Sequence, residues 1–183
     1  MRKTFSNLVA RRGFGAAVIL LSGVALAQQP ADVDGWGKVK WGMTLEQIQK
    51  LYPEAKPYQP KDEAERKAMQ FSDESALEIP GVDLVNTKFE VNFVGKGADK
   101  QIAFVEIYSR AGVTEGTFTE LEKQLRLKYG EPASKNDKDG WFERTWMLPS
   151  TKIELWFHET LQKEPPAAGI SYSPAGKPTR DKS

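Results

Sequence analysis

Residues 141–158 read WFERTWMLPSTKIELWFH, in which two runs of alternating apolar and polar side chains flank Pro149 and Ser150. Such alternation is typical of strands that bury one face, and proline and serine are common in the turns that join strands. A two-residue turn places Leu148 opposite Thr151, and a slip of one residue would mix the two faces of each strand. The stretch therefore predicts an antiparallel hairpin, on which the rest of the fold depends.

This register sorts the side chains of the hairpin onto two faces of different character. One face is largely apolar, and its facing pairs are Phe142 with Phe157, Arg144 with Leu155, and Trp146 with Ile153. The other face pairs Trp141 with His158, Glu143 with Trp156, Thr145 with Glu154, and Met147 with Lys152. Because apolar side chains leave water on folding, we expect the first face to lie on the core. The second face then meets solvent, another part of the chain or a partner.

The second face carries the candidate partner surface. Aromatic side chains gathered on the outside of a sheet often mark a contact with another protein. The candidate residues are Trp141, Glu143, Met147, Trp156 and His158. An alternative that stays open is that the segment at 28–35 or the segment at 61–69 covers them.

Arg144 is a candidate buried charge, because it interrupts the apolar face. A guanidinium group can be buried with a carboxylate partner or stacked on an aromatic ring such as that of Trp146. Alternatively, its aliphatic stem packs on the core while its charged end reaches solvent at the rim of the sheet. The second arrangement is the one we expect from the sequence.

A short amphipathic helix is expected at residues 44–52. Thr44 is its N-cap, and Gln47 completes a capping box three residues later. Apolar side chains recur every three to four residues along this stretch, and Pro53 ends the helix.

A second amphipathic helix is expected at residues 117–129. Thr117 and Glu120 are placed to form its capping box, and Gly130 ends it. The charged stretch at 61–69 is a further candidate helix that faces solvent.

The remaining apolar runs predict strands at residues 36–41, 75–79, 85–94, 102–109 and 168–173. Both amphipathic helices end in a tyrosine, Tyr52 or Tyr129, and both precede a run of strands. The expected fold class is therefore α+β, a tandem repeat of a helix and an antiparallel meander, with the helices packed on an antiparallel sheet. The expected organisation is a signal peptide at 1–27, a leader at 28–35, a single globular domain at 36–173 with similar halves at about 36–110 and 113–173, and a disordered tail at 174–183.

The start of the first helix resembles a known exported module. The residues that carry the resemblance are Trp41, Gly42, Met43, Thr44, Gln47, Ile48, Tyr52 and Pro53. They are similar to the opening of the small outer-membrane assembly lipoproteins of the SmpA/OmlA type, which share a helix-then-meander architecture with the β-lactamase inhibitor proteins. The resemblance implies an exported module that binds something, most often another protein. This chain has no cysteine to carry a lipid anchor.

The first 27 residues have the layout of a secretory signal peptide. Arg2, Lys3, Arg11 and Arg12 precede an uncharged apolar stretch from residue 13 to residue 27. The stretch ends at Ala25-Leu26-Ala27, a small-x-small cleavage pattern. We therefore expect a periplasmic or secreted mature chain that begins near residue 28. An uncleaved anchor is the alternative, and the twin arginines leave the export route open.

Composition excludes several classes of function. Removal of residues 1–27 takes away four of the 26 Lys and Arg residues and none of the 25 Asp and Glu residues, so the mature chain carries a net charge of −3. A slightly acidic chain without a basic stripe is a poor nucleic-acid binder. With no cysteine, the chain can form neither disulfides nor thiolate metal sites. No later stretch is long and apolar enough to be a transmembrane segment.

Candidate catalytic groups are few. His158 is the only histidine, and no nucleophile motif or metal-ligand spacing accompanies it. We therefore expect no cofactor, no metal and no catalytic residue. The leading hypothesis is a non-catalytic module of the cell envelope that binds a protein partner through the aromatic sheet face. The alternatives are a carrier of a small apolar ligand and a carboxylate-based hydrolase acting on envelope material.

Overall fold

The computed structural model describes residues 32–60, 63, 66–67, 74–159 and 165–176. The predicted signal peptide, the first half of the leader, most of the helix predicted at 61–69, and the tail after Gly176 lie outside the described residues. Pro174, which the sequence placed in the tail, is the last residue of a strand. No helix in the described ranges is both long enough and apolar enough to span a bilayer.

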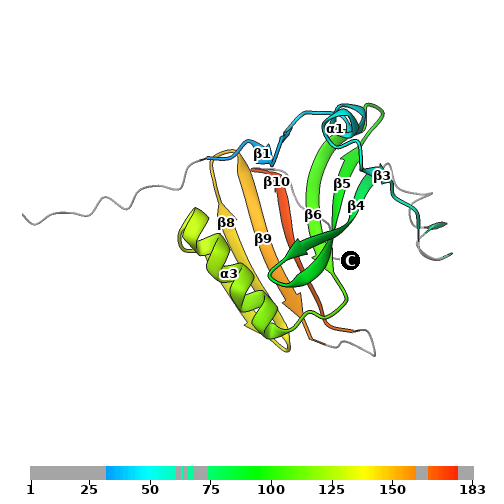
Figure 1. Ribbon diagram of the computed structural model, residues 1–183. Coiled ribbons are helices and arrows are strands. Elements are labelled where there is room, and N and C mark those ends of the chain that lie inside the picture. The colour runs from blue at the N-terminus through cyan, green and yellow to red at the C-terminus, as the bar shows by residue number, and fades with distance from the viewer. Residues whose placement is uncertain (1–31, 61–62, 64–65, 68–73, 160–164, 177–183) are drawn as a thin grey trace, which may run out of the picture.

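Strands make up about half of the described chain (Figure 1). The elements in chain order are β1 (Gly35–Trp36), β2 (Val39–Lys40), α1 (Leu45–Leu51), β3 (Lys56–Pro57), β4 (Glu74–Leu84), β5 (Thr87–Lys96), β6 (Gln101–Ser109), α3 (Glu115–Tyr129), β7 (Ser134–Lys138), β8 (Trp141–Met147), β9 (Thr151–His158) and β10 (Ala167–Pro174).

Strands β3 to β10 form one antiparallel sheet of eight strands, in the order β3-β4-β5-β6-β10-β9-β8-β7. Consecutive strands are neighbours except at the centre of the sheet, where β6 pairs with β10. β1 and β2 form a separate hairpin, because Gly37 turns the chain at a φ of 58°. The single strand predicted at 36–41 is therefore wrong.

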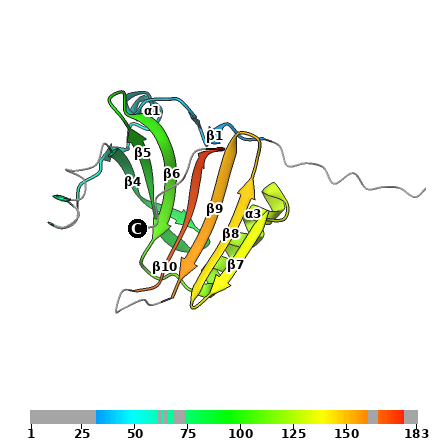
Figure 2. The same cartoon turned by 180° about the vertical axis from the view of Figure 1, so that it is seen from behind.

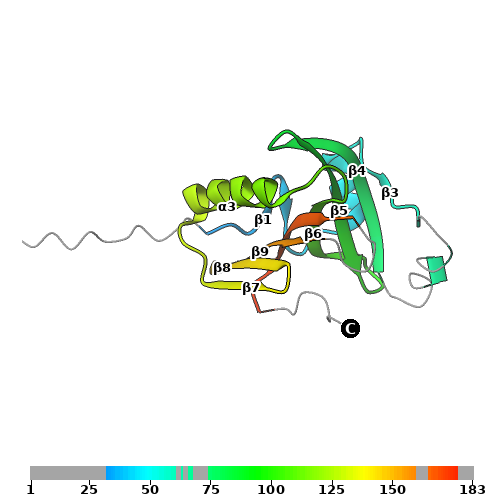
Figure 3. The same cartoon turned by 90° about the horizontal axis from the view of Figure 1, so that it is seen from below.

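Side-chain alternation gives the eight-stranded sheet a core face and an outer face. Phe93, Val105, Ile153 and Leu155 point to the core face and have no exposed surface. The sheet bends so that β4 to β6 stand at an angle to β7 to β9, with α3 inside the bend (Figure 3). The outer face is the opposite side of the sheet, and Figure 2 shows β7 to β10 with α3 behind them.

The capping signals of the first helix are confirmed. Thr44 is the N-cap of α1, its side chain accepts a hydrogen bond from the backbone N–H of Gln47, and the Gln47 side chain accepts one from Thr44 N–H. The β5–β6 turn holds the start of this helix, since Leu45 N–H donates to Lys100 O at 3.1 Å. Ile48 is fully buried below the helix.

The second helix begins earlier than predicted. Thr114, in extended conformation, is the N-cap of α3, and Thr117 is the third helical residue of its capping box. The predicted box from Thr117 and Glu120 is therefore wrong, because a threonine three residues earlier already satisfies the first N–H groups. Gly130 ends the helix as predicted, at a φ of 77°.

The predicted fold class, an α+β tandem repeat with halves at 36–110 and 113–173, is wrong. The described chain is β-rich, and a single sheet holds eight of its strands, whereas α1 has 7 residues and α3 has 15. α1 lies at one end of β5 and β6, and α3 covers β8 and β9 (Figure 1). Strand pairing and alternation therefore organise this fold, and the two helices are additions to the sheet.

The two tyrosines that suggested the repeat lie in different settings. Tyr52 stacks on Trp36 with 6.2 Å between ring centroids, and its hydroxyl accepts a hydrogen bond from Lys38 N–H. Tyr129 is buried, and its hydroxyl forms a hydrogen bond with the hydroxyl of Tyr172. Burial raises the pKa of the Tyr172 hydroxyl. An aromatic side chain in the last turn of an amphipathic helix follows from burial alone, so the similarity of the two helices carries no evidence of a repeat.

Candidate functional site

The β8–β9 hairpin has the predicted register. Trp141 pairs with His158 and Glu143 pairs with Trp156, and Leu148 N–H donates to Thr151 O across the turn. Both pairs lie at the end of the outer face that is remote from this turn. The register alone therefore brings four of the five candidate partner-surface residues together.

Three of these side chains form a group of parallel rings, which we call the ring cluster: Trp141, Trp156 and His158. The ring centroids are 5.8 to 6.0 Å apart in all three pairs, and the ring planes lie within 4 to 8° of parallel. Three centroids at nearly equal distances form a triangle, so the rings do not stack in a column. All three side chains are half-buried.

Gly169 on β10 makes room for the ring of Trp156. The two residues are paired across β9 and β10, and a Cβ atom at position 169 would lie 2.6 Å from Cζ2 of Trp156. A glycine beside an aromatic residue on the neighbouring strand lets the ring lie over the backbone. The Trp156 indole therefore rests on β10, which fixes its position before any partner arrives.

Hydrogen bonds orient the other two rings of the cluster. Nε1 of Trp141 donates to Oε2 of Glu143 at 3.2 Å. Nδ1 of His158 lies 2.9 Å from the carbonyl oxygen of Glu159. A carbonyl oxygen only accepts, so Nδ1 carries the proton, and Nε2 is an acceptor in the neutral ring.

Met147 belongs to the same face but lies apart from the ring cluster. It pairs with Lys152 beside the β8–β9 turn, and its side chain is 54% exposed. The sequence placed Met147 on the correct face of the hairpin. Its position at the opposite end of β8 separates it from the rings.

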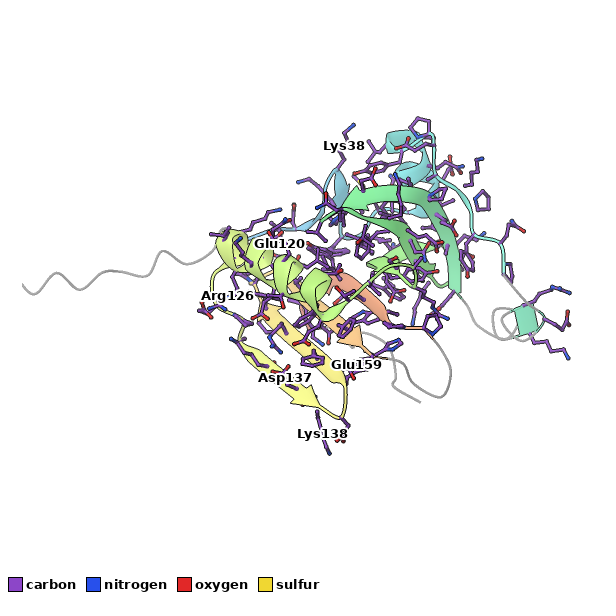
Figure 4. The ribbon with its side chains drawn as sticks, turned by 60° about the horizontal axis from the view of Figure 1, so that its bottom comes forward. Lys38, Glu120, Arg126, Asp137, Lys138 and Glu159 are labelled. Atoms are coloured by element: carbon purple, nitrogen blue, oxygen red, sulfur yellow. The ribbon has the colours of Figure 1, made fainter. Side chains whose placement is uncertain are left out.

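Arg144 lies on the core face, where α3 and β7 meet β8. Its side chain is 9% exposed, and Nε donates to Glu122 on α3 at 2.9 Å. Nη1 and Nη2 donate to the two carboxylate oxygens of Asp137 on β7, the latter at 3.1 Å. Figure 4 shows Asp137 on the edge strand, with Arg126 on α3 nearby.

The ion pairs of Arg144 correct the expectation that its charged end reaches solvent. The guanidinium carbon lies 5.1 Å from the ring centroid of Phe118, not on Trp146 as the alternative had it. Burial by itself would lower the pKa of Arg144, but the hydrogen bonds and charges of Asp137 and Glu122 outweigh it and raise that pKa. Arg144 is a structural cation that joins a helix to the edge of the sheet.

A group of polar residues on the outer face was not found from the sequence. Asn92 on β5 pairs with Glu78 on β4 and with Glu106 on β6, and Ser171 on β10 pairs with Glu106 in turn. These residues alternate with the buried side chains of their strands, which is the one signal that could have revealed them. They lie in a row that crosses four strands, one side-chain row away from Trp156.

The described surface has open hollows. One, of about 910 Å³, lies between the β4–β5 hairpin and α3, and its lining is largely polar and includes Asp83, Asn86, Thr117 and Glu120. Another, of about 360 Å³, lies beside Glu90 and Tyr108. Within the described ranges, no group of three acidic or histidine side chains is arranged to hold a metal ion.

Comparison with known proteins gives no match. No family model fits the chain, and no curated protein or solved structure matches it. The resemblance carried by Trp41–Thr44 to exported modules therefore stays a prediction, and the function is argued from the geometry of the outer face.

Proposed function

We propose that this chain is an exported, non-catalytic module that binds a protein partner through the ring cluster on the outer face of its sheet. The observation that carries the proposal is the parallel, half-buried arrangement of Trp141, Trp156 and His158. The support for export is the basic start and uncharged apolar stretch of residues 1–27. We therefore place the contact in the cell envelope or outside the cell.

The rings suit a protein partner because their positions are fixed in advance. Tryptophan is enriched among residues that dominate binding energy at protein interfaces, where large rings contribute contact area at low entropic cost. Trp156 rests on Gly169, and Trp141 is held by Glu143. Little rotamer freedom is then lost on binding, and that favours affinity.

The geometry gives less support to a carrier of a small apolar ligand. Such a site needs an enclosed cavity lined mainly by hydrophobic side chains. The larger hollow has polar residues such as Asp83, Asn86 and Glu120 in its lining. The rings, in contrast, belong to a sheet surface, which suits a broad contact.

Site-specific photo-crosslinking tests the proposal. Asn136 on β7 is exposed and pairs with Glu143, so a benzophenone side chain at position 136 lies beside the ring cluster. In cells that express the chain, we expect a crosslinked band of defined mass that disappears when Trp141 and Trp156 are both replaced by alanine. The matched control is a benzophenone at Leu127, which is 82% exposed on α3.

The control distinguishes a specific contact from non-specific crosslinking. We expect position 127 to give no band of that mass. Equal crosslinking from positions 127 and 136, or a band that survives loss of both tryptophans, would show that the ring cluster does not carry the contact.

A further inference from the structure

The two edges of the eight-stranded sheet differ in their protection against pairing with another chain. β3, at one edge, is two residues long and contains Pro57, and the register of β4 beside it shifts between Ile79 and Val82. Short strands, proline and bulges are features that keep a sheet edge from pairing. β7, at the other edge, has five residues in unbroken register with β8 and contains no proline (Figure 2). Of the two edges, β7 is therefore the one that can accept another strand.

The pairing pattern shows which backbone groups of β7 point outward. Backbone hydrogen bonds alternate along an antiparallel strand, so each residue bonds to one neighbouring strand only. Leu148 N–H donates to Thr151 O, so the even-numbered residues of β8 bond to β9 and its odd-numbered residues bond to β7. The odd-numbered residues of β8 pair with the even-numbered residues of β7. The N–H and C=O groups of Lys135 and Asp137 therefore point away from the sheet, and they have no hydrogen-bond partner among the described residues.

The charge that β7 itself exposes is positive. All five of its residues are exposed, but both carboxylate oxygens of Asp137 already accept hydrogen bonds from Arg144. Lys135 lies 3.8 Å from Glu122, with 46% of its side chain exposed. Lys138 projects away from the sheet and has no ion-pair partner in the part of the chain that the structure describes (Figure 4). Lysines on an edge disfavour apolar and basic strands, whereas an acidic strand gains a favourable cross-strand pair.

We propose that β7 binds an acidic, extended segment of the partner protein as an added strand of the sheet. The inference rests on the proposed function, because it names the chemistry of the partner segment and the place where it joins this chain. In such complexes, main-chain hydrogen bonds supply affinity and side chains supply specificity. Here the main-chain bonds are those of Lys135 and Asp137, and the specific contact is an acidic side chain opposite Lys138.

The added strand and the ring cluster form one contact surface. Lys138 pairs with Trp141, so the end of β7 lies directly beside the ring cluster on the outer face. Neighbouring strands are about 4.8 Å apart, so an added strand lies about 10 Å from β8. A long apolar side chain of that strand, or the next residues of the partner, can therefore reach the rings while the backbone pairs with β7.

Amide hydrogen exchange, followed by NMR, tests the edge residue by residue. In the free chain, exchange should be fast at Lys135 and Asp137 and slow at Asn136 and Lys138, because only the latter two donate to β8. The probe is a fluorescein-labelled peptide in which glutamate alternates with threonine. At saturating peptide, we expect exchange at Lys135 and Asp137 to slow at least about tenfold.

Two matched peptides separate backbone pairing from charge. One has the same sequence with every backbone nitrogen methylated, which removes its N–H donors and keeps its charge. The other has lysine in place of each glutamate. By fluorescence anisotropy, we expect the acidic peptide to bind at least about tenfold more tightly than either match. These measurements use the unaltered chain, so they do not depend on the folding of any variant.

Variants locate the binding at β7. Lys135→Pro and Lys135→Ala both remove the lysine side chain, but only the proline also removes the outward N–H. Proline is tolerated on an edge strand where its nitrogen faces away from the sheet, so we expect Lys135→Pro to fold and to bind the acidic peptide at least about tenfold more weakly than Lys135→Ala. Lys138→Glu should reverse the preference between the acidic and the basic peptide.

The inference fails if exchange at Lys135 and Asp137 stays fast with the peptide bound. It also fails if the fully methylated peptide binds as tightly as its match, or if Lys138→Glu leaves the peptide preference unchanged. Slow exchange at Lys135 and Asp137 without peptide, rising in protection with protein concentration, would show that a second copy of the chain occupies this edge instead of a partner strand.

The crosslinking experiment separates this inference from the proposed function. A crosslink from Asn136 that needs both tryptophans and survives Lys135→Pro would leave the proposed function standing without the added strand. Peptide binding that is lost in Lys135→Pro, together with a crosslink that does not depend on the tryptophans, would leave the strand site and remove the ring cluster from the proposed function.

Discussion

Trp146 and Trp156 lie on neighbouring strands of one hairpin in opposite environments. Trp146 points to the core face, is 1% exposed, and donates from Nε1 to Gly130 O at 2.8 Å. Trp156 points to the outer face, is half-buried, and rests on Gly169. The same residue type therefore closes the core on one side of the sheet and presents a fixed ring on the other.

Polar groups show the same contrast between the two faces. On the core face, Arg144 has carboxylate partners from both α3 and β7. On the outer face, the amide oxygen of Asn92 is buried and has no partner among the described residues. The buried charge on the core face is therefore paired, whereas the buried acceptor on the outer face has no partner within the part of the chain that the structure describes.

The largest expected effect on stability comes from replacing each of these two tryptophans by alanine. Trp146→Ala should lower the free energy of unfolding by about 3–5 kcal/mol, because it empties a closed core site and removes a hydrogen bond. Trp156→Ala should cost about 1 kcal/mol, since only part of its ring leaves water on folding. Urea denaturation measures both. Similar losses for the two variants would mean that the outer ring is also core.

Removal of the buried arginine should have the next largest effect. Arg144→Ala leaves Glu122 and Asp137 without their bridging cation, and the free energy of unfolding should fall by about 3 kcal/mol. Arg126→Ala is the matched control, because Arg126 also lies near Glu122 but its side chain is 42% exposed, and it should cost less than about 1 kcal/mol. Equal losses would place Arg144 among ordinary surface ion pairs.

Gly169→Ala should displace the outer ring. The added Cβ would lie 2.6 Å from Trp156 and 3.0 Å from the carbonyl oxygen of Ile107. We expect a loss of about 1–3 kcal/mol, and a changed tryptophan signal in near-ultraviolet circular dichroism, because the ring must shift. In a Trp156→Ala background the same substitution should cost less, which a double-mutant cycle reports. Additive losses would contradict the contact.

The smallest expected effect concerns Asp32, which holds the N-terminal segment to the β8–β9 turn. Its carboxylate accepts hydrogen bonds from the hydroxyl and N–H of Ser150, and these lower the pKa of Asp32 below its ordinary value of 3.8. A lowered folded-state pKa stabilises the fold fully above the ordinary value, and the effect is lost as pH falls through the folded value.

The pH dependence of Asp32→Asn tests this tie. The wild-type chain should have the higher melting temperature at pH 7, and the difference should close as the pH falls below 3.8. A difference that is constant down to pH 2 would show that the charge of Asp32 does not hold the segment.

The sequence was sufficient for features that depend on local pattern. The register of the β8–β9 hairpin follows from alternation about Pro149 and Ser150, and the cap at Thr44 follows from its spacing to Gln47. These features need only neighbours along the chain or across one turn. The four clustered residues of the candidate surface could therefore be placed on one face before any tertiary structure was known.

Features that depend on contacts between distant segments were not predictable. The partners of Arg144 come from α3 and β7, and no pattern near Arg144 points to Glu122. The row through Asn92 and Glu106 exists because β6 pairs with β5 and β10, and each strand alone shows only an ordinary polar position. The repeat was wrong for a related reason, since helix capping recurs wherever a short helix starts.

The most direct test of the account is the affinity of the crosslinked partner for two purified variants of this chain. In one, Trp141 and Trp156 are alanine; in the other, the equally apolar and more exposed Leu127 is alanine. We predict that the tryptophan variant binds at least about tenfold more weakly than the wild type, while the Leu127→Ala variant binds as the wild type does. Unchanged affinity in the tryptophan variant would contradict the assignment of the outer face to binding.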